Sequence, residues 1–276
     1  MVWVREFTAP QFNNLTVEPQ GICFLDANTL LITSHQANSR AVLQMVNTSG
    51  VVLGQCSSTE YRHPGSVRVA PNGDVWIQDF FATGSGGNGF TTGTVDLESC
   101  FASGVLEITP WALAQDVQTV AGLDFASLEG VDYVLLHEYS TTGTPWLYVF
   151  LQSQMSAPAS AATRVKRFSL GLRSQDVAHC NGRLYSSSNA NGGAIIGYDF
   201  ATMMALPDGS VPSSVQVVAA PNQFGEALAF HPTTNRCWMM TEFSSRAAWS
   251  QDIVPQVIEP GEPGIASLQF FAGWRV

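Results

Sequence analysis

The sequence is poor in charged residues and nearly without lysine. Asp, Glu, Lys and Arg make up 12% of the 276 residues, about half the usual share of a soluble domain. Lys166 is the sole lysine. The formal net charge of −10 argues against nucleic acid as a partner, because binding its phosphates requires a basic surface. Ser, Thr, Gly, Asn and Gln supply the polar surface instead. That composition fits an extracellular or virion setting, although codon bias would produce it too.

Long apolar runs are absent as well. No stretch approaches the ~18 consecutive apolar residues that a membrane-spanning helix needs. Arg5 interrupts the first apolar residues too early for the core of a signal peptide. We therefore expect no membrane insertion. A virion or extracellular location would have to be reached without a signal peptide, and a cytoplasmic location stays open.

The five cysteines include no C-x-x-C pair, so a zinc site or a redox motif has no support. Cys23, Cys180 and Cys237 fall in segments with strand character, where a free cysteine serves as a small buried apolar residue. Cys56 and Cys100 fall near predicted strand ends. Either a disulfide or two free thiols fits that placement.

One stretch, 65–79, sets the pattern for the chain. It reads GSVRVAPNGDVWIQD, in which two apolar runs flank a Pro-Asn-Gly turn at 71–73. Asn-Gly between such runs predicts a tight β-hairpin, because both residues tolerate positive φ. Apolar residues make up 45% of the chain, enough for a large core. No segment has clear helical periodicity, and 111–117 is the one short helical candidate.

The same hairpin pattern recurs, in degenerate form, at intervals of roughly fifty residues. The four other copies are at 21–33, 122–136, 176–187 and 226–240. Third strands are predicted at 41–45, 92–97, 146–151, 194–198 and 267–270, and fourth strands at 51–54, 105–108, 163–168 and 215–218. Four strands per unit at this period is the signature of a β-propeller, in which each blade buries its faces against its neighbours.

The fifth unit lacks a fourth strand of its own, while an N-terminal strand at 2–7 has no partner. Pairing this strand with 267–270 would close the ring and remove exposed edges. The sequence therefore predicts an all-β, single-domain propeller of five blades. Six blades are the alternative, because the long loops at 80–92 and 243–264 have room for strands. The predicted segments are a closing strand at 1–10 and blades at 17–57, 60–109, 118–169, 172–220 and 223–276.

Two phrases in the second unit carry a family resemblance: Pro64-Gly65-Ser66-Val67-Arg68-Val69 and Pro71-Asn72-Gly73-Asp74-Val75-Trp76. They resemble the blade motifs of the propellers that include the NHL-repeat proteins and the gluconolactonase (senescence-marker) family. Gluconolactonase-like enzymes hold a metal through a Glu, an Asn and an Asp on innermost strands. The resemblance thus implies a metal on Asp176 and Glu226. Glycine stands at the other three equivalent positions and asparagine at none, which departs from the family's site.

In a propeller, the starts of innermost strands and the ends of second strands open onto the same rim. This rule gathers the following side chains at one mouth of the central channel: Asp79, Glu138, Asp176, Glu226, Glu242, His35, His63 and His137. The acids suit Ca²⁺ or another divalent cation, since Ca²⁺ takes six to eight oxygens. Such a cation could polarise a lactone or ester carbonyl. Alternatively, the acids accept backbone N–H bonds at blade ends and the histidines pack between blades.

Other motifs have weaker support. The G-x-G-x-x-G sequence at 84–89 is followed by no helix start, so we predict a loop there and no dinucleotide site. No G-x-S-x-G nucleophile elbow is present. Trp76 falls in a predicted strand and is expected to pack between blades. Trp111, Trp249 and Tyr139 fall in predicted loops, where an exposed ring could stack on a sugar.

These observations favour a non-catalytic binding or structural module. Its polar loops would face a glycan, a small ligand or a protein partner. The setting would be a virion, as a phage decoration or receptor-binding protein, or a cell surface, and an oligomer or larger assembly stays open. The alternative is an enzyme at the acidic mouth: a metal-assisted lactonase- or esterase-like hydrolase, or a glycosidase using two of the carboxylates.

Overall fold

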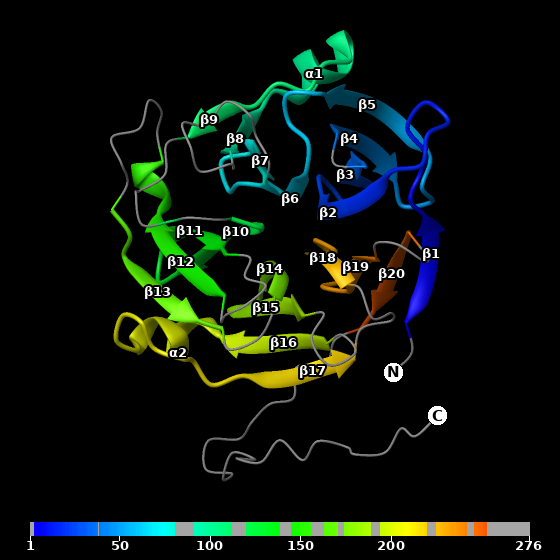
Figure 1. Cartoon of the computed structure of the whole chain (residues 1–276). Coiled ribbons are helices and arrows are strands. Elements are labelled where there is room, and N and C mark those ends of the chain that lie inside the picture. Colours follow the sequence, from blue (N-terminus) through cyan, green and yellow to red (C-terminus); the bar gives the residue numbers. More distant parts are fainter. Residues whose placement is uncertain are drawn as a thin grey trace.

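The computed structural model of the chain describes residues 3–37, 39–80, 91–111, 117, 120–138, 145–155, 163–170, 174–188, 194–219, 225–241 and 246–252. Twenty strands in these ranges form five four-stranded antiparallel sheets. The sheets surround a central axis as the blades of a propeller, and the prediction of five blades is confirmed (Figure 1). No helix in the described part of the chain is long and apolar enough to cross a membrane.

The first four blades take their strands in chain order, from the centre outwards. Blade 1 consists of β2 (Glu18–Phe24), β3 (Thr29–Gln36), β4 (Arg40–Asn47) and β5 (Val52–Ser58). Blade 2 consists of β6 (Pro64–Val69), β7 (Val75–Asp79), β8 (Thr91–Val95) and β9 (Thr109–Trp111). Blade 3 consists of β10 (Gly122–Leu128), β11 (Val131–His137), β12 (Trp146–Leu151) and β13 (Lys166–Ser169). Blade 4 consists of β14 (Ser174–Cys180), β15 (Arg183–Ser188), β16 (Ala194–Asp199) and β17 (Val215–Ala219).

Blade 5 joins the two ends of the described chain. Its strands are β18 (Gly225–Phe230), β19 (Cys237–Thr241), β20 (Ala247–Gln251) and the N-terminal β1 (Val4–Thr8). Closure by the N-terminal strand is confirmed, but its predicted partner is wrong. β1 pairs with β20, with Thr8 opposite Ala247. The segment 267–270, predicted to be this third strand, lies outside the described residues.

Two short helices lie outside the blades, α1 (Leu97–Ser103) and α2 (Phe200–Ala205). Each begins after an aspartate whose carboxylate accepts a backbone N–H: Asp96 from Ser99 at 3.1 Å and Asp199 from Thr202 at 2.8 Å. Sequence periodicity missed both helices because they span fewer than two turns. The helical candidate at 111–117 is wrong at its start, since Trp111 lies in β9; 112–116 is outside the described residues.

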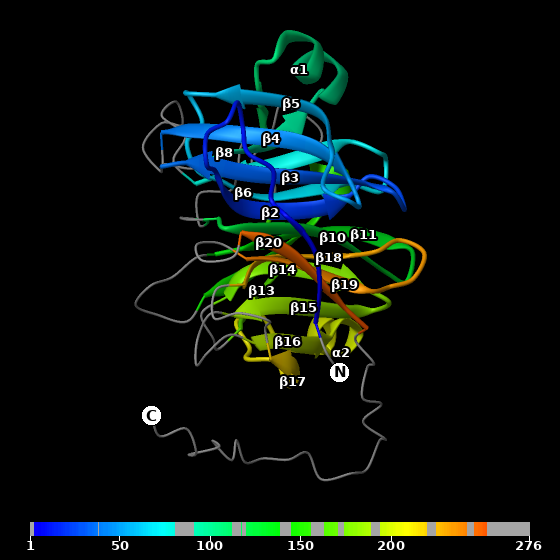
Figure 2. The same ribbon diagram turned by 90° about the vertical axis from the view of Figure 1, so that its right-hand side faces the viewer.

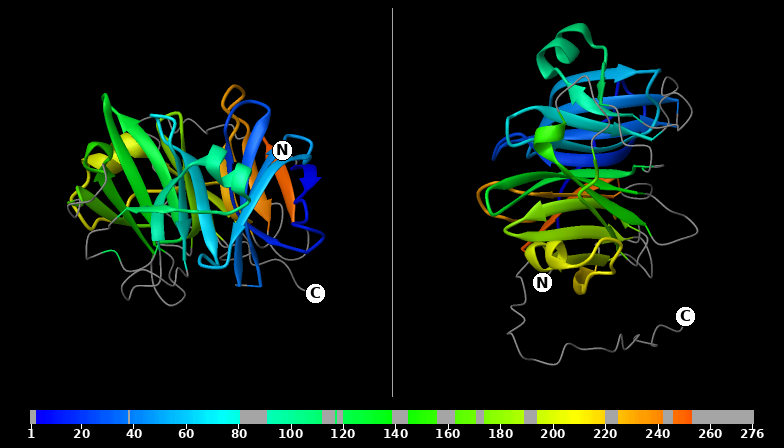
Figure 3. Two further views of the ribbon diagram at one scale, coloured as in Figure 1. Left: turned by 90° about the horizontal axis from the view of Figure 1, so that it is seen from above. Right: turned by 90° about the vertical axis from the view of Figure 1, so that its left-hand side faces the viewer.

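The helix α1 displaces the last strand of blade 2. That strand was predicted at 105–108, and the structure has it at Thr109–Trp111. α1 lies at the outer edge of the molecule beside β5, away from the channel (Figures 1, 2 and 3). The β8–β9 connection therefore leaves blade 2 and crosses to the outer strand of blade 1 before it returns.

Glycines at the starts of innermost strands allow neighbouring blades to approach closely. A Cβ added to Gly21 would lie 2.3 Å from the carbonyl oxygen of Gly65. A Cβ added to Gly65 would lie 2.4 Å from the carbonyl oxygen of Ala121. Both distances are too short for any side chain, so glycine is required there by backbone packing around the channel.

Candidate functional site

Arg68 of β6 lies among the innermost strands and contacts three of them. Its Nη1 donates to the carbonyl of Ile22 in β2 at 3.0 Å, and its Nη2 donates to that of Val177 in β14 at 2.7 Å. Nη2 also lies 2.6 Å from Asp176 Oδ2 in β14. Nε lies 3.2 Å from Asp124 Oδ1 in β10. The side chains of Arg68, Asp124 and Asp176 are called the central ion cluster below; each of these residues is buried.

Asp176 also connects the central ion cluster to β18, the innermost strand of blade 5. Its Oδ2 accepts from the backbone N–H of Leu228 in β18 at 3.0 Å, and its Oδ1 accepts from the Ser66 hydroxyl. All five innermost strands are thus joined through one buried group of charges. The oxygens of Asp176 are engaged with protein donors, and a divalent cation on Asp176 and Glu226 stays a prediction.

The cluster holds one positive and two negative groups, and the pKa values of both carboxyls lie above their ordinary range. Burial raises the pKa of Asp124 to about 6, although Arg68 opposes the rise. Burial likewise raises the pKa of Asp176 against the opposing charge of Arg68. For Arg68, burial alone would lower the pKa, but the two carboxylates outweigh it and the net shift is upward. Arg68 is therefore charged at neutral pH.

Two of the predicted histidines meet between blades 1 and 2. The rings of His35 and His63 stack with centroids 4.3 Å apart. His63 Nε2 lies 3.0 Å from Gln20 Oε1, and His35 Nε2 lies 3.3 Å from Glu18 Oε2. This packing between blades matches the structural alternative considered for the histidines.

Two of the acids predicted at the channel mouth have described hydrogen-bond partners within the protein. Asp79, fully buried at the end of β7, accepts from the backbone N–H groups of Arg62 and His63 at 3.0 and 2.9 Å. Glu226 is 7% exposed and accepts from Gln175 Nε2 at 3.3 Å. No group of three or more His, Cys, Asp or Glu side chains suited to a metal occurs among the residues with a described placement.

Two of the remaining predicted residues, His137 and Glu138, lie in and next to β11 of blade 3. His137, at the end of β11, is fully buried, and neither ring nitrogen has a hydrogen-bond partner within the described ranges. Burial lowers the pKa of His137 to about 3, so the ring is neutral. Glu138 accepts from the Tyr148 hydroxyl at 3.4 Å. Glu242 lies outside the described residues.

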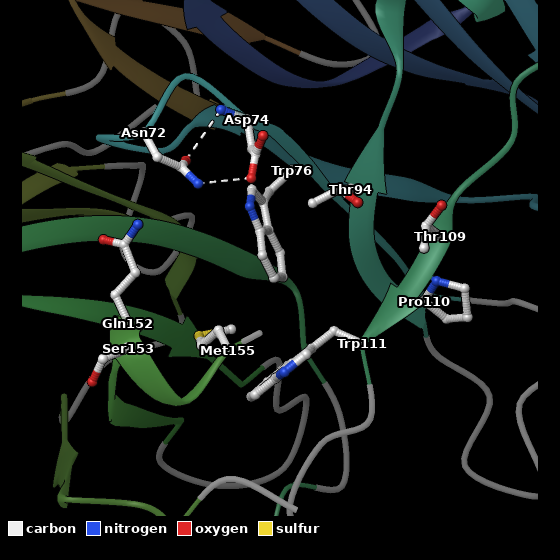
Figure 4. A pocket seen from close by; sticks show the side chains of 10 residues that line it. All are labelled: Asn72, Asp74, Trp76, Thr94, Thr109, Pro110, Trp111, Gln152, Ser153 and Met155. Atoms are coloured by element: carbon white, nitrogen blue, oxygen red, sulfur yellow. Dashed lines mark hydrogen bonds between the residues drawn. The ribbon is translucent and has the colours of Figure 1, made fainter. Parts of the chain in front are cut away.

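A second candidate site lies at the opposite end of β7 from Asp79. It is a cavity of about 390 Å³, within the range of about 300–1,000 Å³ of small-molecule sites. We call it the interblade groove, because its walls come from blades 2 and 3 (Figure 4). Its lining residues are Asn72, Asp74, Trp76, Thr94, Thr109, Pro110, Trp111, Gln152, Ser153 and Met155.

The two indoles of the interblade groove are held rigidly by the core. Trp76 of β7 and Trp111 of β9 meet edge to face with ring centroids 6.3 Å apart. Trp76 also packs on Phe125 at 6.1 Å and Trp111 on Phe150 at 5.9 Å, both edge to face. Figure 4 shows both indoles pointing into the cavity together with Met155. These contacts fix an apolar wall without any need for the ligand to order it.

Polar groups complete the groove. Asn72 Nδ2 donates to Asp74 Oδ2 at 2.8 Å, and the Asp74 backbone N–H donates to Asn72 Oδ1 at 3.2 Å, so the β6–β7 turn fixes both side chains. Gln152 Oε1 and Trp111 Nε1 are buried and have no hydrogen-bond partner in the described part of the chain. Among the residues that the structure describes, the lining contains no Lys, Arg or His, and Asp74 is its one charged residue.

Sequence reasoning missed this groove. The turn at 71–73 and the packing of Trp76 are confirmed, but Gln152 belongs to a short 3₁₀ turn, η1 (Gln152–Gln154), that only the ring of blades brings beside blade 2. The placement of Trp111 and Trp249 in loops is wrong, since they lie in β9 and β20. Tyr139 lies outside the described residues.

No protein-family model matches the sequence, and no curated protein sequence matches it. Among solved structures, a glutaminyl cyclase of Myxococcus xanthus is similar, with a TM-score of 0.56 and 13% identity over 91% of this chain and 97% of that chain. The tail fibre of Staphylococcus aureus phage P68 is similar with a TM-score of 0.52 and 13% identity over 91% of this chain. The match covers 52% of the tail-fibre chain. At such identity these likenesses show the fold alone, and membership of the NHL-repeat or gluconolactonase families stays a prediction.

Proposed function

We propose that the chain is a non-catalytic carbohydrate-binding module whose interblade groove takes a neutral saccharide. One observation carries this proposal: two fixed indoles, Trp76 and Trp111, share a cavity with neutral polar side chains and no cationic one. An indole offers a flat apolar face to the C–H face of a pyranose ring. The amide, hydroxyl and carboxylate groups around it suit sugar hydroxyls.

Two buried polar atoms without partners, Trp111 Nε1 and Gln152 Oε1, narrow the class of ligand that suits the groove. Leaving such an atom unpaired costs about 1–3 kcal/mol. Trp111 Nε1 can only donate and Gln152 Oε1 can only accept. A hydroxyl does both, so a saccharide suits both atoms, and reaching them requires a small shift of the side chains that cover them. An ammonium would leave the indole N–H unpaired, and a phosphate or carboxylate would find no cation among the described lining residues.

We further propose that this module works on a virion or at a cell surface. The charge-poor surface supports such a setting, and so does the likeness to a phage tail fibre at the level of the fold. The glycan would then be the surface polymer that the assembly meets. Any protein partner or oligomeric arrangement is part of this proposal as well.

Calorimetric titration tests the groove. The probes are neutral oligosaccharides built from glucose, galactose, mannose or N-acetylglucosamine. We expect at least one to bind, and Asp74→Ala and Gln152→Ala to weaken it roughly tenfold each, the loss of one hydrogen bond at about 1.4 kcal/mol. Asp132→Ala, in the equivalent hairpin of blade 3, and Gln154→Ala, in the same turn η1, should bind like the unaltered protein.

Two results would overturn the groove as the site. One is binding of no neutral probe while an acidic or cationic one binds. The other is equal binding by the groove variants and their controls. Both Asp74 and Gln152 have at least part of their surface in solvent, so their replacement leaves the core intact.

The second candidate function is acid–base catalysis at the channel mouth, as a hydrolase, a glycosidase or a cyclase. The observation that favours it is Glu226, a carboxylate 7% exposed at the start of β18 and held by Gln175. A glutaminyl cyclase shares the fold over 97% of its own length. Turnover of a glutaminyl peptide, a lactone or an aryl glycoside that Glu226→Gln eliminates would support it. No turnover of all three by the unaltered protein would remove it.

A further inference from the structure

The helix α1 and the strand β5 hold two cysteines against each other. Cys56 in β5 is 1% exposed and Cys100 in α1 is 3% exposed. Both belong to the apolar cluster between blades 1 and 2, and the Cys100 thiol is close enough to Cys56 to contribute to the raised pKa of Cys56. The Cys100 thiol donates to the carbonyl of Glu107 at 3.9 Å. All five cysteines of the chain are free thiols in this structure. The pair joins blade 1 to the helix in the β8–β9 connection of blade 2, at positions 44 residues apart.

Backbone contacts on both sides of the pair fix its position. The N–H of Ser57 donates to the carbonyl of Gly104 at 3.2 Å, and the N–H of Leu106 donates to the carbonyl of Ser57 at 2.9 Å. The Phe101 ring covers Gly54, where an added Cβ would lie 3.1 Å from it. The residues on either side of Cys56 are thus held by residues that follow Cys100 in the chain, so the fold keeps the two cysteines close together.

We propose that Cys56 and Cys100 form a disulfide when the protein meets an oxidising environment, and that this bond fastens α1 to blade 1. The oxidant is a small disulfide such as oxidised glutathione. One protein thiolate attacks its S–S bond, forms a mixed disulfide and releases one glutathione thiolate. The second protein thiolate then attacks the protein sulfur of the mixed disulfide and releases the other glutathione. Two protons leave the cysteines and two electrons pass to glutathione.

The bond would act on the connection that leads into the interblade groove. The segment after α1 runs to β9, whose Thr109 and Trp111 line the groove. Its Ile108 is already tied to blade 1, because the Tyr61 hydroxyl donates to the Ile108 carbonyl at 3.2 Å. A disulfide at Cys100 would add a covalent link to blade 1 at the start of this segment, in α1. Only this consequence rests on the proposed function; the bond itself does not.

Burial slows the reaction in the folded protein. Burial and the neighbouring thiol raise the pKa of Cys56, so little thiolate is present at neutral pH. Exchange needs the thiolate. We therefore expect slow closure in the native state, faster closure at alkaline pH, and ready closure when the reduced chain is refolded in a glutathione redox buffer.

Intact-mass and peptide mapping test the proposal on the full chain. The reduced protein is treated natively, or refolded, with oxidised glutathione, then unfolded and alkylated. We expect two of the five thiols to escape alkylation and one cross-linked peptide pair containing Cys56 and Cys100. The melting temperature should rise on oxidation and fall back on reduction. Cys100→Ser should show neither effect, whereas Cys23→Ser should behave like the unaltered protein.

Three results would overturn the proposal. The first is five alkylated thiols after refolding in the oxidising buffer, with the protein folded. The second is a cross-link between any other pair, such as Cys180 and Cys237. The third is glutathione left on Cys56 or Cys100 without closure. Saccharide binding by either redox form does not test the disulfide. The proposed function and the disulfide are therefore tested independently.

Discussion

The guanidinium of Arg68 in β6 lies 2.6 Å from the carboxylate of Asp176 in β14, although blade 3 stands between their blades in the ring. The contact therefore runs across the inside of the ring rather than between neighbouring blades. With Asp124 it forms a buried cluster that all five innermost strands reach. We infer that these charges hold the blades in register around the channel.

Removal of the central cation should destabilise the whole propeller. Arg68→Met leaves Asp124 and Asp176 buried without their counter-charge, and breaking such a pair typically costs 3–5 kcal/mol. We expect a loss of about that size in the free energy of unfolding, measured by chemical denaturation. Arg5→Met, at an exposed arginine, should stay within about 0.5 kcal/mol of the unaltered protein. If the two variants are equally stable, the cluster does not hold the ring.

The raised pKa of Asp124 should make the free energy of unfolding depend on pH. Its pKa is about 6 when folded against an ordinary 3.8, so between these values the folded protein binds a proton that the unfolded chain has released. The stability that this proton contributes is complete below the unfolded pKa and is lost as pH rises through the folded pKa. Asp124→Asn removes the titration.

We measure this effect as the free energy of unfolding of the unaltered protein minus that of Asp124→Asn, at a series of pH values. The difference should fall by up to about 3 kcal/mol as pH rises between the two pKa values, at about 1.4 kcal/mol per unit of pKa shift, and should level off above them. A difference that rises over this interval would show that Asp124 is an ordinary ion-paired acid.

Close packing of the innermost strands predicts a sharp contrast between two glycines. Gly65→Ala puts a Cβ within 2.4 Å of a backbone oxygen that cannot move alone, so we expect about 1–3 kcal/mol of destabilisation in thermal or chemical unfolding. Gly54→Ala, on the outer strand of blade 1, meets the movable ring of Phe101 at 3.1 Å and should cost less. Equal costs would mean that the blades have room to separate.

The fold was largely predictable because the sequence pattern that encodes it lies within short segments of the chain. A hairpin with a tight turn recurs in every blade, and each copy must bury both faces, so the count of five and the N-terminal closure follow. The third strand of blade 5 was predicted in the wrong place because that prediction also relied on local sequence pattern. Its sequence, AAWSQ at Ala247–Gln251, is short and weakly apolar, whereas 267–270 is more strand-like in composition.

The site was less predictable because its partners are set by ring closure. Asp176 meets Ser66, 110 positions away, and no spacing rule links them. A signal did exist: Arg68 and Asp124 each put a charge inside an otherwise apolar innermost strand, in adjacent blades and with opposite signs. The rim rule put His35 and His63 at the same mouth, and they stack there, but it left open which groups Asp79 would bind; its Oδ2 accepts two backbone N–H bonds.

The central claim about function is tested most directly by the indole N–H resonances of the protein's seven tryptophans, labelled with ¹⁵N. The neutral oligosaccharides named above are added to saturation, and Trp111→Phe assigns one signal. We predict that the Trp111 and Trp76 signals shift, Trp111 most because its Nε1 gains a hydrogen bond, while that of Trp238 in blade 5 stays in place. Unchanged Trp111 and Trp76 signals, or a shift confined to tryptophans outside the groove, would contradict the interblade groove as the saccharide site.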